Sequence, residues 1–486
     1  MFKLTALVSI VFSFHIFADV TIKDAPMEWL VVETLQHKYN EPFIGQIQDD
    51  LLKEISQNIE YDIARDELIF KTQKNLADLR EKLIDFLETK YKKTQIDEKF
   101  ISWASEKNSN IAIKLEGTSE KVNGFYYFNH IHTNISQDNS SLKWLKHSPH
   151  ETYQMLKSFL SRRRARGAVA LTDHDSDKAH NDIQSILDSK LHSLRGVEWG
   201  GATHMCLVGI KENWDNLSHG REYEGEESVK ESRSSEGFRI VNHPNRKNPA
   251  FPQLSWLDAD GVEVWNTILE NSPFYYKRSN NRDALDQWTD SLKRGQTYTA
   301  VAGSDFHFSI PCLQEKTLVY PVNFIPGVDQ TKTKEYLFDG RTSFITRSEA
   351  PKLTLRARKS GSASWTLMGG KLPDAKKVDI ELLADFSDTR ARLGGFCYNT
   401  VRRFYRLFTF WKKEIWEVRF YNLKNEVVAK EIINPKLYNA KKHLKASFSL
   451  NIEGSTDIVR AELWAVNKKQ KQIDLLGATN PIYINW

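Results

Sequence analysis

Between Gly124 and His307, short apolar runs alternate with segments in which apolar residues recur at helical spacing. Runs of about four to eight apolar residues bounded by turn residues are typical of buried strands. The helical segments include residues 149–166 and 281–294. Strands and helices in alternation predict an α/β fold with a parallel sheet or barrel. No other feature of the chain constrains its fold as strongly.

Several of these runs end in histidines or acidic residues. The first run leads into His130 and His132, and Asp305 and His307 repeat the same spacing after the last run. Side chains of a strand alternate with period two, so each pair faces one side and can hold a metal ion. A histidine pair alone is more often part of a packed core, but further candidate ligands lie next to the intervening runs: His174, Glu198, His204 and His243.

In this order along the chain, the segments resemble the motifs of the PHP superfamily, named for polymerase and histidinol phosphatase domains. The motifs are His130-Ile131-His132-Thr133, Thr172-Asp173-His174, Gly196-Val197-Glu198, His204, Asn242-His243-Pro244, Gly261-Val262-Glu263-Val264-Trp265-Asn266 and Gly303-Ser304-Asp305-Phe306-His307. The resemblance covers about residues 124–346. It implies a distorted (β/α)7 barrel with two or three divalent metal ions at its C-terminal mouth and phosphoester hydrolysis as the activity.

The resemblance also implies a role for each matched residue. The first metal site takes His130, His132, the bridging carboxylate Glu198 and Asp305; the second takes His204 and His243; the third takes His174 and His307, with Asp138 as their companion. Glu198, Asp305 and His307 are the residues expected to act in catalysis. Imidazole and carboxylate ligands suit zinc, manganese or iron, and the absence of cysteine ligands leaves the metal open.

Two positions depart from the family's pattern. Phe128 stands where an acid often supports the first histidine, and Gln137 separates Ser136 from Asp138, which the family places side by side. Arg246 follows the Asn-His-Pro motif. Its guanidinium is a candidate for holding a substrate phosphate, and an exposed arginine without this role is the alternative.

Three further polar residues in the motifs have two interpretations each. Asp173 is either a ligand or a residue that orients its neighbour His174, and we favour the second role. Glu263 and Asn266 either line the pocket or form structural hydrogen bonds.

These residues predict an exported metal-dependent phosphoesterase that hydrolyses phosphate mono- or diesters with a metal-bridged hydroxide. Clustered divalent cations neutralise the charge of the ester and lower the pKa of a bridging water from about 15.7 toward 7. The alternatives are a binding protein built on an inactive barrel and a nuclease-type phosphodiesterase that acts on a polyanion. An amidohydrolase would need a metal-bridging lysine on a barrel strand, and we find no lysine at such a position.

The outer segments predict four regions: a signal peptide (1–18), a helical region (19–120), the PHP domain (121–346) and a C-terminal β-sandwich (347–486). Lys3 precedes a nearly continuous apolar run that ends before Ala18. This run is shorter than the roughly 20 residues of a membrane-spanning helix, so we expect export to the periplasm or the extracellular space, with no transmembrane segment. The strand-like runs beyond residue 346 are typical of a sandwich. Three cysteines allow at most one internal disulfide.

The expected partner is a phosphorylated substrate, and the net charge of the chain identifies no other. The net charge of +5 over 486 residues excludes only a strongly basic wrapping protein, so nucleic acid is possible but not indicated. Basic and aromatic residues interleave over 402–413, which suits either a polyanion or membrane contact or, as we favour, an edge hairpin. The sequence gives no indication of the oligomeric state.

Overall fold

The computed structural model describes thirteen segments of the chain. They are residues 59–62, 67–70, 111–136, 146–199, 204–211, 235–244, 259–267, 281–307, 314–387, 415–433, 443–452, 456–467 and 472–486. The chain divides into two compact units, one comprising residues 1–110 and 470–474 and the other residues 111–469 and 475–486. The predicted signal peptide, the basic and aromatic segment 402–413, Asp138 and Arg246 lie outside the described residues.

In the first unit the structure describes one hairpin, and it corrects a prediction. β1 (Ile59–Asp62) pairs antiparallel with β2 (Glu67–Phe70), although we predicted the region 19–120 to be helical. Ile59 pairs with Phe70 and Tyr61 with Leu68, and within β1 these two apolar residues alternate with charged ones at the period of a strand. β3 (Lys114–Gly117) is also a strand inside the region 19–120 that we predicted to be helical.

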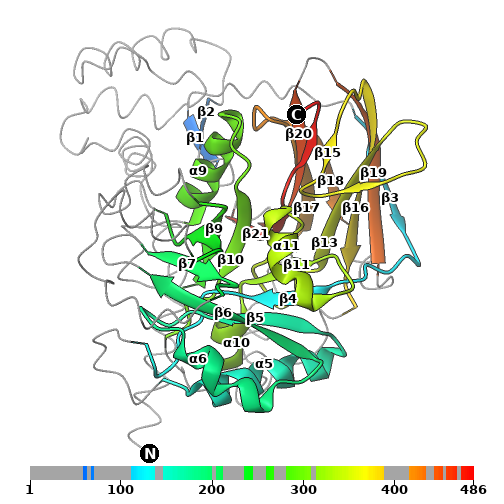
Figure 1. Ribbon diagram of the computed structural model, residues 1–486. Helices are drawn as coiled ribbons and strands as arrows, with labels where there is room; N and C mark the ends of the chain where they lie inside the picture. Colours follow the sequence, from blue (N-terminus) through cyan, green and yellow to red (C-terminus); the bar gives the residue numbers. More distant parts are fainter. Residues whose placement is uncertain are drawn as a thin grey trace, which may run out of the picture. The chain divides into compact units, whose positions relative to one another are not determined.

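The second unit is built on a curled mixed sheet that forms a half-barrel (Figure 1). Its strands are β4 (Phe125–Phe128), β5 (Gly167–Leu171), β6 (Leu191–Trp199), β7 (Met205–Val208), β8 (Phe238–Val241), β9 (Gly261–Asn266) and β10 (Thr299–Gly303). β4, β5 and β6 are parallel, as are β8, β9 and β10, but β7 runs antiparallel to both of its neighbours. The predicted α/β class is therefore confirmed.

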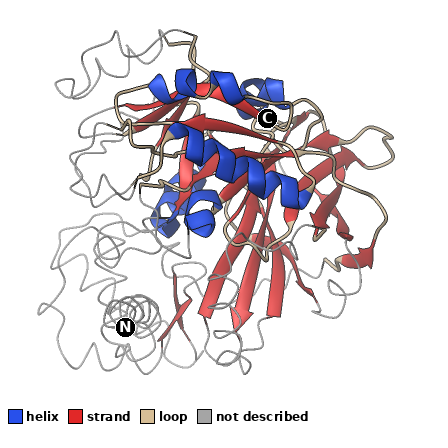
Figure 2. Cartoon of the chain, turned by 90° about the horizontal axis from the view of Figure 1, so that it is seen from below, coloured by secondary structure: helices blue, strands red, loops and turns tan. Residues whose placement is uncertain are grey.

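The described helices are few: α5 (Pro149–Arg163), α6 (Lys178–Asp182), α9 (Asn281–Lys293), α10 (Gln314–Val319) and α11 (Thr333–Phe338). All precede residue 339, and Figure 2 shows them gathered along the half-barrel. The regular (β/α)7 pattern is not confirmed, since β6, β7 and β8 are antiparallel neighbours, which need no crossover helix.

The sequence of α5 explains where this helix begins and ends. The Ser148 hydroxyl accepts from the Glu151 N–H, and the Glu151 carboxylate accepts from the Ser148 N–H in return, a capping box. Arg162 and Arg163 lie in the last turn, where cations complement the helix dipole. Leu156 and Phe159 are buried in the core that α5 shares with β4 and β5.

The sheet does not stop at the end of the half-barrel. It continues from β4 through β11 (Val322–Ile325), β12 (Ser343–Ile345), β21 (Gln472–Thr479), β20 (Asp457–Asn467), β17 (Ile415–Tyr421) and β18 (Val427–Ile433). Two short strands attach to this path, β15 (Lys371–Leu372) and β22 (Ile482–Ile484). Hydrogen bonds between β12 and β21 thus join the half-barrel to C-terminal strands across the expected boundary at residue 346.

A separate antiparallel sheet packs against these C-terminal strands. Its order is β14 (Thr366–Leu367), β13 (Lys352–Lys359), β16 (Lys377–Asp385), β19 (His443–Asn451) and β3. The two layers share one buried core, in which the rings of Phe420 and Phe448 meet with centroids 4.7 Å apart. In Figure 1, β3 lies beside β19, far from it in the sequence.

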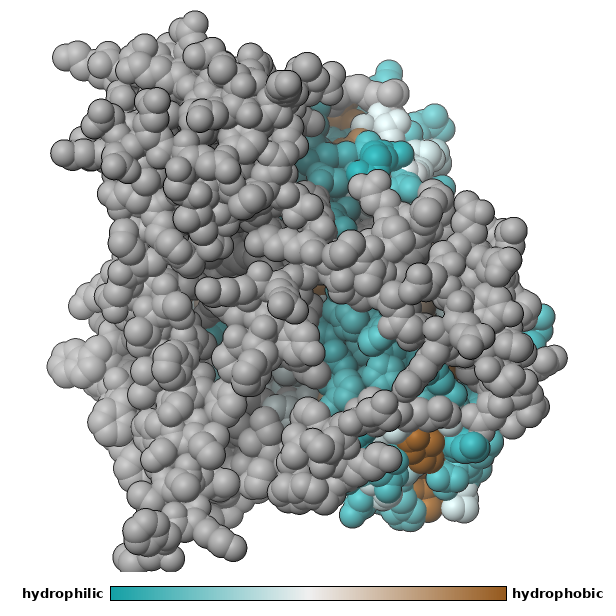
Figure 3. Space-filling model, turned by 90° about the vertical axis from the view of Figure 1, so that its left-hand side faces the viewer, coloured by the Kyte–Doolittle hydropathy of each residue, from teal (hydrophilic) through white to brown (hydrophobic). Residues whose placement is uncertain are grey.

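The described surface is mainly polar. On the face in Figure 3, most described residues that reach the surface are hydrophilic. The exposed large hydrophobic residues are Val328, Phe338 and Ile432. Among the described helices, none has both the length and the apolar character required to cross a membrane.

Candidate metal centre

Eight of the predicted ligands lie together beyond the strand ends of the half-barrel. They are His130, His132, His174, Glu198, His204, His243, Asp305 and His307, and they form four overlapping groups of three whose ligand atoms lie within 4.8 Å of one another. We call these eight residues the metal cluster. The ninth predicted ligand, Asp138, and the predicted phosphate-binding residue, Arg246, are outside the described residues.

Hydrogen bonds between the two edges of the half-barrel bring the metal cluster together. The His132 N–H donates to the Phe306 carbonyl at 3.0 Å, and the Ser304 N–H donates to the Asn129 carbonyl at 3.3 Å. The segments that follow β4 and β10 therefore run side by side, although more than 170 residues separate them. This pairing places His130 and His132 against Asp305 and His307.

Glu198 lies at the centre of the metal cluster. Its Oε1 is 3.0 Å from His130 Nε2 and 3.1 Å from His204 Nδ1. Its Oε2 is 3.1 Å from His132 Nε2 and 3.2 Å from His174 Nδ1. Each oxygen thus faces two imidazoles, the arrangement expected of a carboxylate that bridges two ions.

Asp305 closes the other side of the metal cluster. Its Oδ1 lies 3.3 Å from His130 Nε2, 3.4 Å from His132 Nε2 and 3.1 Å from His307 Nδ1. Ligands that each lie about 2.0 to 2.2 Å from one zinc ion are about 3 to 3.5 Å from one another. The observed separations match that spacing.

Two buried atoms of the metal cluster lack hydrogen-bond partners among the described residues. They are His132 Nε2 and Glu198 Oε2, which face each other. Buried polar atoms are nearly always satisfied in native proteins. A divalent ion accepts the lone pairs of both atoms, so the residues present fit metal ions.

Glu263 fixes the orientation of His130. Glu263 Oε1 lies 2.8 Å from His130 Nδ1, and since a carboxylate only accepts, Nδ1 carries a proton and Nε2 points at Glu198 and Asp305. Glu263 Oε2 accepts from the His243 N–H at 2.8 Å and from Asn266 Nδ2 at 3.0 Å. Such outer carboxylates set the tautomer and ring position of metal-binding histidines.

The neighbouring glycine leaves room for this carboxylate. A Cβ added at Gly303 would fall 1.9 Å from Glu263 Oε1 and 2.6 Å from the Cβ of His130. Only glycine fits here, one position before the Ser304-Asp305 segment.

Three residues of the metal cluster adopt positive φ, which is uncommon outside glycine. The angles are 57° at His130, 30° at His243 and 49° at Asp305. Such conformations cost on the order of 1–3 kcal/mol each and gather at functional sites. The strain therefore supports a functional role for this part of the chain.

The two central carboxyl groups are ionised. Burial opposes ionisation of Glu198, but His130 and His204 outweigh it and hold the pKa well below the ordinary value. Burial likewise opposes ionisation of Asp305, and His130 and His307 outweigh it and lower the pKa. Both carboxylates are available as ligands at neutral pH.

The histidines differ in their affinity for protons. Burial disfavours a charge on His130, but Asp305, Glu263 and Glu198 overcome this effect and raise its pKa well above the ordinary value. Burial lowers the pKa of His174 to about 3, so this imidazole is neutral and its lone pair is available. A metal ion and a proton compete for such lone pairs. The surplus of negative charge around His130 favours the binding of a proton or of a metal ion.

The histidines of the metal cluster differ in their exposure. The side chains of His130 and His132 are fully buried, whereas those of His174, His243 and His307 are each 15% accessible and that of His204 is 28% accessible. A ligand therefore approaches over the rim formed by the last four histidines.

Two supporting residues were missed at the sequence level. Asn242 donates from Nδ2 to Glu198 Oε1 at 2.7 Å, and Ser136 Oγ accepts from the His174 N–H at 3.0 Å. Asn242 stands in the Asn-His-Pro motif, and Ser136 follows the first motif closely, so their position near predicted ligands was the available signal. Asp173 accepts from the N–H and hydroxyl of Thr133 and belongs to none of the four groups, and its role in orienting His174 stays a prediction.

Comparison with known proteins adds no assignment: no family model matches this chain, and no curated protein matches it. The functional argument therefore rests on the residues and their geometry.

Proposed function

We propose that this chain is an exported, metal-dependent phosphoesterase of the PHP type, which hydrolyses phosphate mono- or diesters. The observation that carries the proposal is the convergence of six imidazoles and two carboxylates beyond the strand ends of the half-barrel. The family's seven-stranded barrel belongs to this proposal, with the described half-barrel as its frame.

The residues present would hold two or three divalent ions. Glu198 would bridge ions held by His130 and His132 on one side and by His204 and His243 on the other, while His174 and His307 would hold a third. Bound zinc, manganese or iron would supply charge neutralisation for the phosphate oxygens and a water of lowered pKa.

The chain's own residues would prepare this site for a phosphate ester. Glu263 keeps the proton of His130 on Nδ1 and so directs Nε2 inward. Buried Phe306, between Asp305 and His307, and buried Ile131, between His130 and His132, exclude water from behind the site. Arg246 would hold the substrate phosphate from outside the metal cluster.

The proposal is tested by metal analysis and hydrolysis together. Purified mature protein should contain two or three divalent ions per chain and hydrolyse an aryl phosphate monoester or diester, and the ratio of the two rates sets the substrate class. His132→Ala and Asp305→Ala should lose both properties, while His150→Ala, at an exposed position on α5, should keep both.

Circular dichroism of each variant separates loss of the site from loss of the fold. Less than one ion per chain in the folded wild type would overturn the site assignment. Full metal content without hydrolysis of any phosphoester would favour the binding-protein alternative instead. Export is tested separately: N-terminal sequencing of protein recovered outside the cytoplasm should begin at Asp19, after the small residue Ala18.

A further inference from the structure

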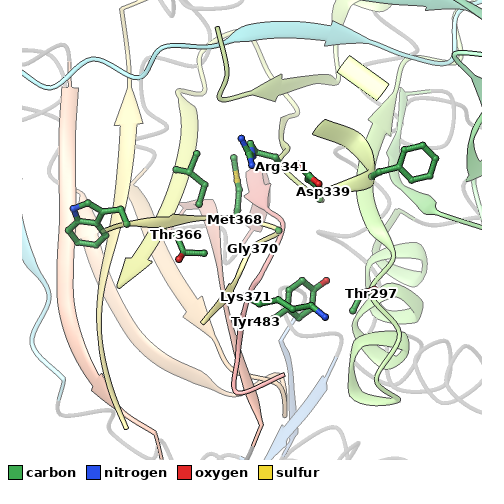
Figure 4. A pocket seen from close by; sticks show the side chains of 13 residues that line it. Thr297, Asp339, Arg341, Thr366, Met368, Gly370, Lys371 and Tyr483 are labelled. Atoms are coloured by element: carbon green, nitrogen blue, oxygen red, sulfur yellow. Dashed lines mark hydrogen bonds and ion pairs between the residues drawn. The ribbon is translucent and has the colours of Figure 1, made fainter. Parts of the chain in front are cut away.

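A second hollow lies at the opposite end of β10 from the metal cluster. Its volume is about 590 Å³, and it is bounded by Thr297, the turn from Phe338 to Arg341, the segment from Trp365 to Lys371, and Tyr483 (Figure 4). Thr297 precedes β10, whereas Asp305 follows it. Five strand residues span about 17 Å, so the hollow and the metal cluster are separate places.

The hollow combines aromatic rings with charged groups. Arg341 and Lys371 bring two positive charges and Asp339 brings one negative charge. Arg341 Nη2 lies 3.4 Å from Asp339 Oδ2, with both side chains partly exposed, and Lys371 has no ion-pair partner among the residues that the structure describes. The charged lining is therefore net positive.

Trp365 forms an aromatic wall that is held in place from behind. The guanidinium groups of Arg356 and Arg358 lie 4.5 and 4.4 Å from its ring. Such contacts fix the ring, while Glu120, Glu381 and Asp379 pair with the two guanidinium groups. Phe338, half exposed, and the ring of Tyr483 add apolar surface.

Tyr483 brings a polar group to the lining of the hollow. Tyr483 is only 5% exposed, lines the hollow, and its hydroxyl makes no hydrogen bond to the described residues. Tyr483 is the strand partner of Lys371 across the parallel β15–β22 pair, and Figure 4 shows the two side chains together. A hydroxyl and an ammonium thus face the hollow side by side.

The walls of the hollow are preformed. Gly369, at φ +84°, packs so closely on the neighbouring turn that an added Cβ would lie 1.8 Å from the Asp339 carbonyl oxygen. Its N–H donates to the Pro481 carbonyl at 2.7 Å. These contacts hold the turn 338–341, the segment 365–371 and the residues before β22 together without a ligand, and preformed sites lose less entropy on binding.

We infer that this hollow binds an anionic saccharide of one or two rings. Flat aromatic rings pack on the apolar face of a pyranose, while Asp339, Thr366 and the Tyr483 hydroxyl suit its hydroxyl groups. Arg341 and Lys371 favour a carboxylate on the sugar. The volume falls within the range of about 300–1,000 Å³ that is usual for small-molecule sites. The inference does not depend on the function proposed above.

The test is calorimetric titration of the full chain with a glucuronate-containing disaccharide, glucose and acetate. The disaccharide should bind at least about tenfold more tightly than glucose or acetate. Lys371→Ala should weaken its binding about tenfold and Tyr483→Phe about fivefold, as expected for the loss of one charged or one neutral hydrogen bond. Lys376→Ala, at an exposed position nearby, is the matched control and should change the affinity less than about twofold.

Metal content should be unchanged in Lys371→Ala, which separates this site from the metal cluster. Failure of the wild type to bind the disaccharide, equal binding of glucose, or equal affinities in wild type, Lys371→Ala and Tyr483→Phe would each overturn the inference. Both substitutions spare the fold, because Lys371 is exposed and Tyr483→Phe keeps the buried ring.

Discussion

Buried carboxylates occur in two parts of the second unit and are satisfied in opposite ways. Among the C-terminal strands, Asp385 is 4% exposed, lies 2.8 Å from Lys352 Nζ and accepts from the Ser387 N–H at 2.8 Å. In the metal cluster, Glu198 is 1% exposed, faces imidazole nitrogens, and its Oε2 has no hydrogen-bond partner among the described residues. A charge of the first kind has its counter-charge within the chain, whereas a carboxylate of the second kind is suited to an added cation.

Glu198→Gln should therefore have the largest effect on metal binding and little effect on the metal-free fold. The substitution keeps the shape but removes the charge shared by the predicted sites, and we expect hydrolysis to fall at least about a thousandfold. Chelation should lower the unfolding temperature of the wild type, because a ligand at about 1,000 times its Kd stabilises by about 4 kcal/mol. The same treatment should leave the Glu198→Gln variant unchanged.

Urea unfolding of both chelated proteins gives the decisive comparison. The difference between their free energies of unfolding should be smaller than the stability that the wild type loses on chelation, because glutamine keeps the shape and an oxygen that can accept from Asn242 Nδ2. Glu335→Gln, at an exposed position on α11, serves as the control and should behave as the wild type throughout. A Glu198→Gln protein that still binds its full complement of metal would show that Glu198 is structural, like Asp385.

Glu263→Gln should have a smaller effect on the same site. Glutamine retains one acceptor for His130 Nδ1 but loses the charge and one of the two accepting oxygens, so the His243 N–H or Asn266 Nδ2 loses its partner. Loss of an outer carboxylate typically weakens metal affinity or activity by about 10- to 100-fold. Metal titration and steady-state kinetics measure both quantities, and an unchanged affinity would contradict the orienting role.

Local spacing decides which of these features could be predicted from the sequence. His130 with His132, and Asp305 with His307, stand two residues apart next to apolar runs, so strand periodicity alone indicates a shared face. The role of Glu263 depends on a contact with His130, 133 positions away, and no local pattern encodes it. The hollow beside Tyr483 is assembled from four distant segments of ordinary composition, which is why it went unpredicted.

The errors in fold have equally local causes. The apolar positions of residues 59–70 fit both a helix and a hairpin. The pairing of Ile59 with Phe70 shows that these residues form a hairpin. The run Met205–Val208 was expected to continue a parallel pattern, but its short connection to β6 makes the two strands antiparallel. Apolar runs predict that strands exist, and the connections between them decide their direction.

Asp385→Asn should destabilise the fold and leave the metal cluster intact. Burial raises the pKa of Asp385, but Lys352 outweighs it and lowers the pKa below its ordinary value. A lowered pKa in the folded state gives stability that is present above the unfolded value of about 4 and is lost as the pH falls below it. We expect a loss of about 2 kcal/mol at pH 7 that shrinks below pH 4, measured by urea unfolding across this range. A difference that is constant with pH would contradict the charged pair.

The smallest expected effect is the coupling between the two ends of β10. Glu263→Gln acts on the metal cluster and Lys371→Ala acts on the hollow, and no residue belongs to both places. Effects at distant sites without shared partners add within about 0.5 kcal/mol. The double variant should therefore have the metal affinity of Glu263→Gln and the saccharide affinity of Lys371→Ala. A larger coupling would mean that β10 transmits strain from Gly303, where Glu263 packs, to the Thr297 end. The two sites would then be one regulated unit, because any effect of the saccharide on metal affinity must be matched by an equal effect of the metal on saccharide affinity.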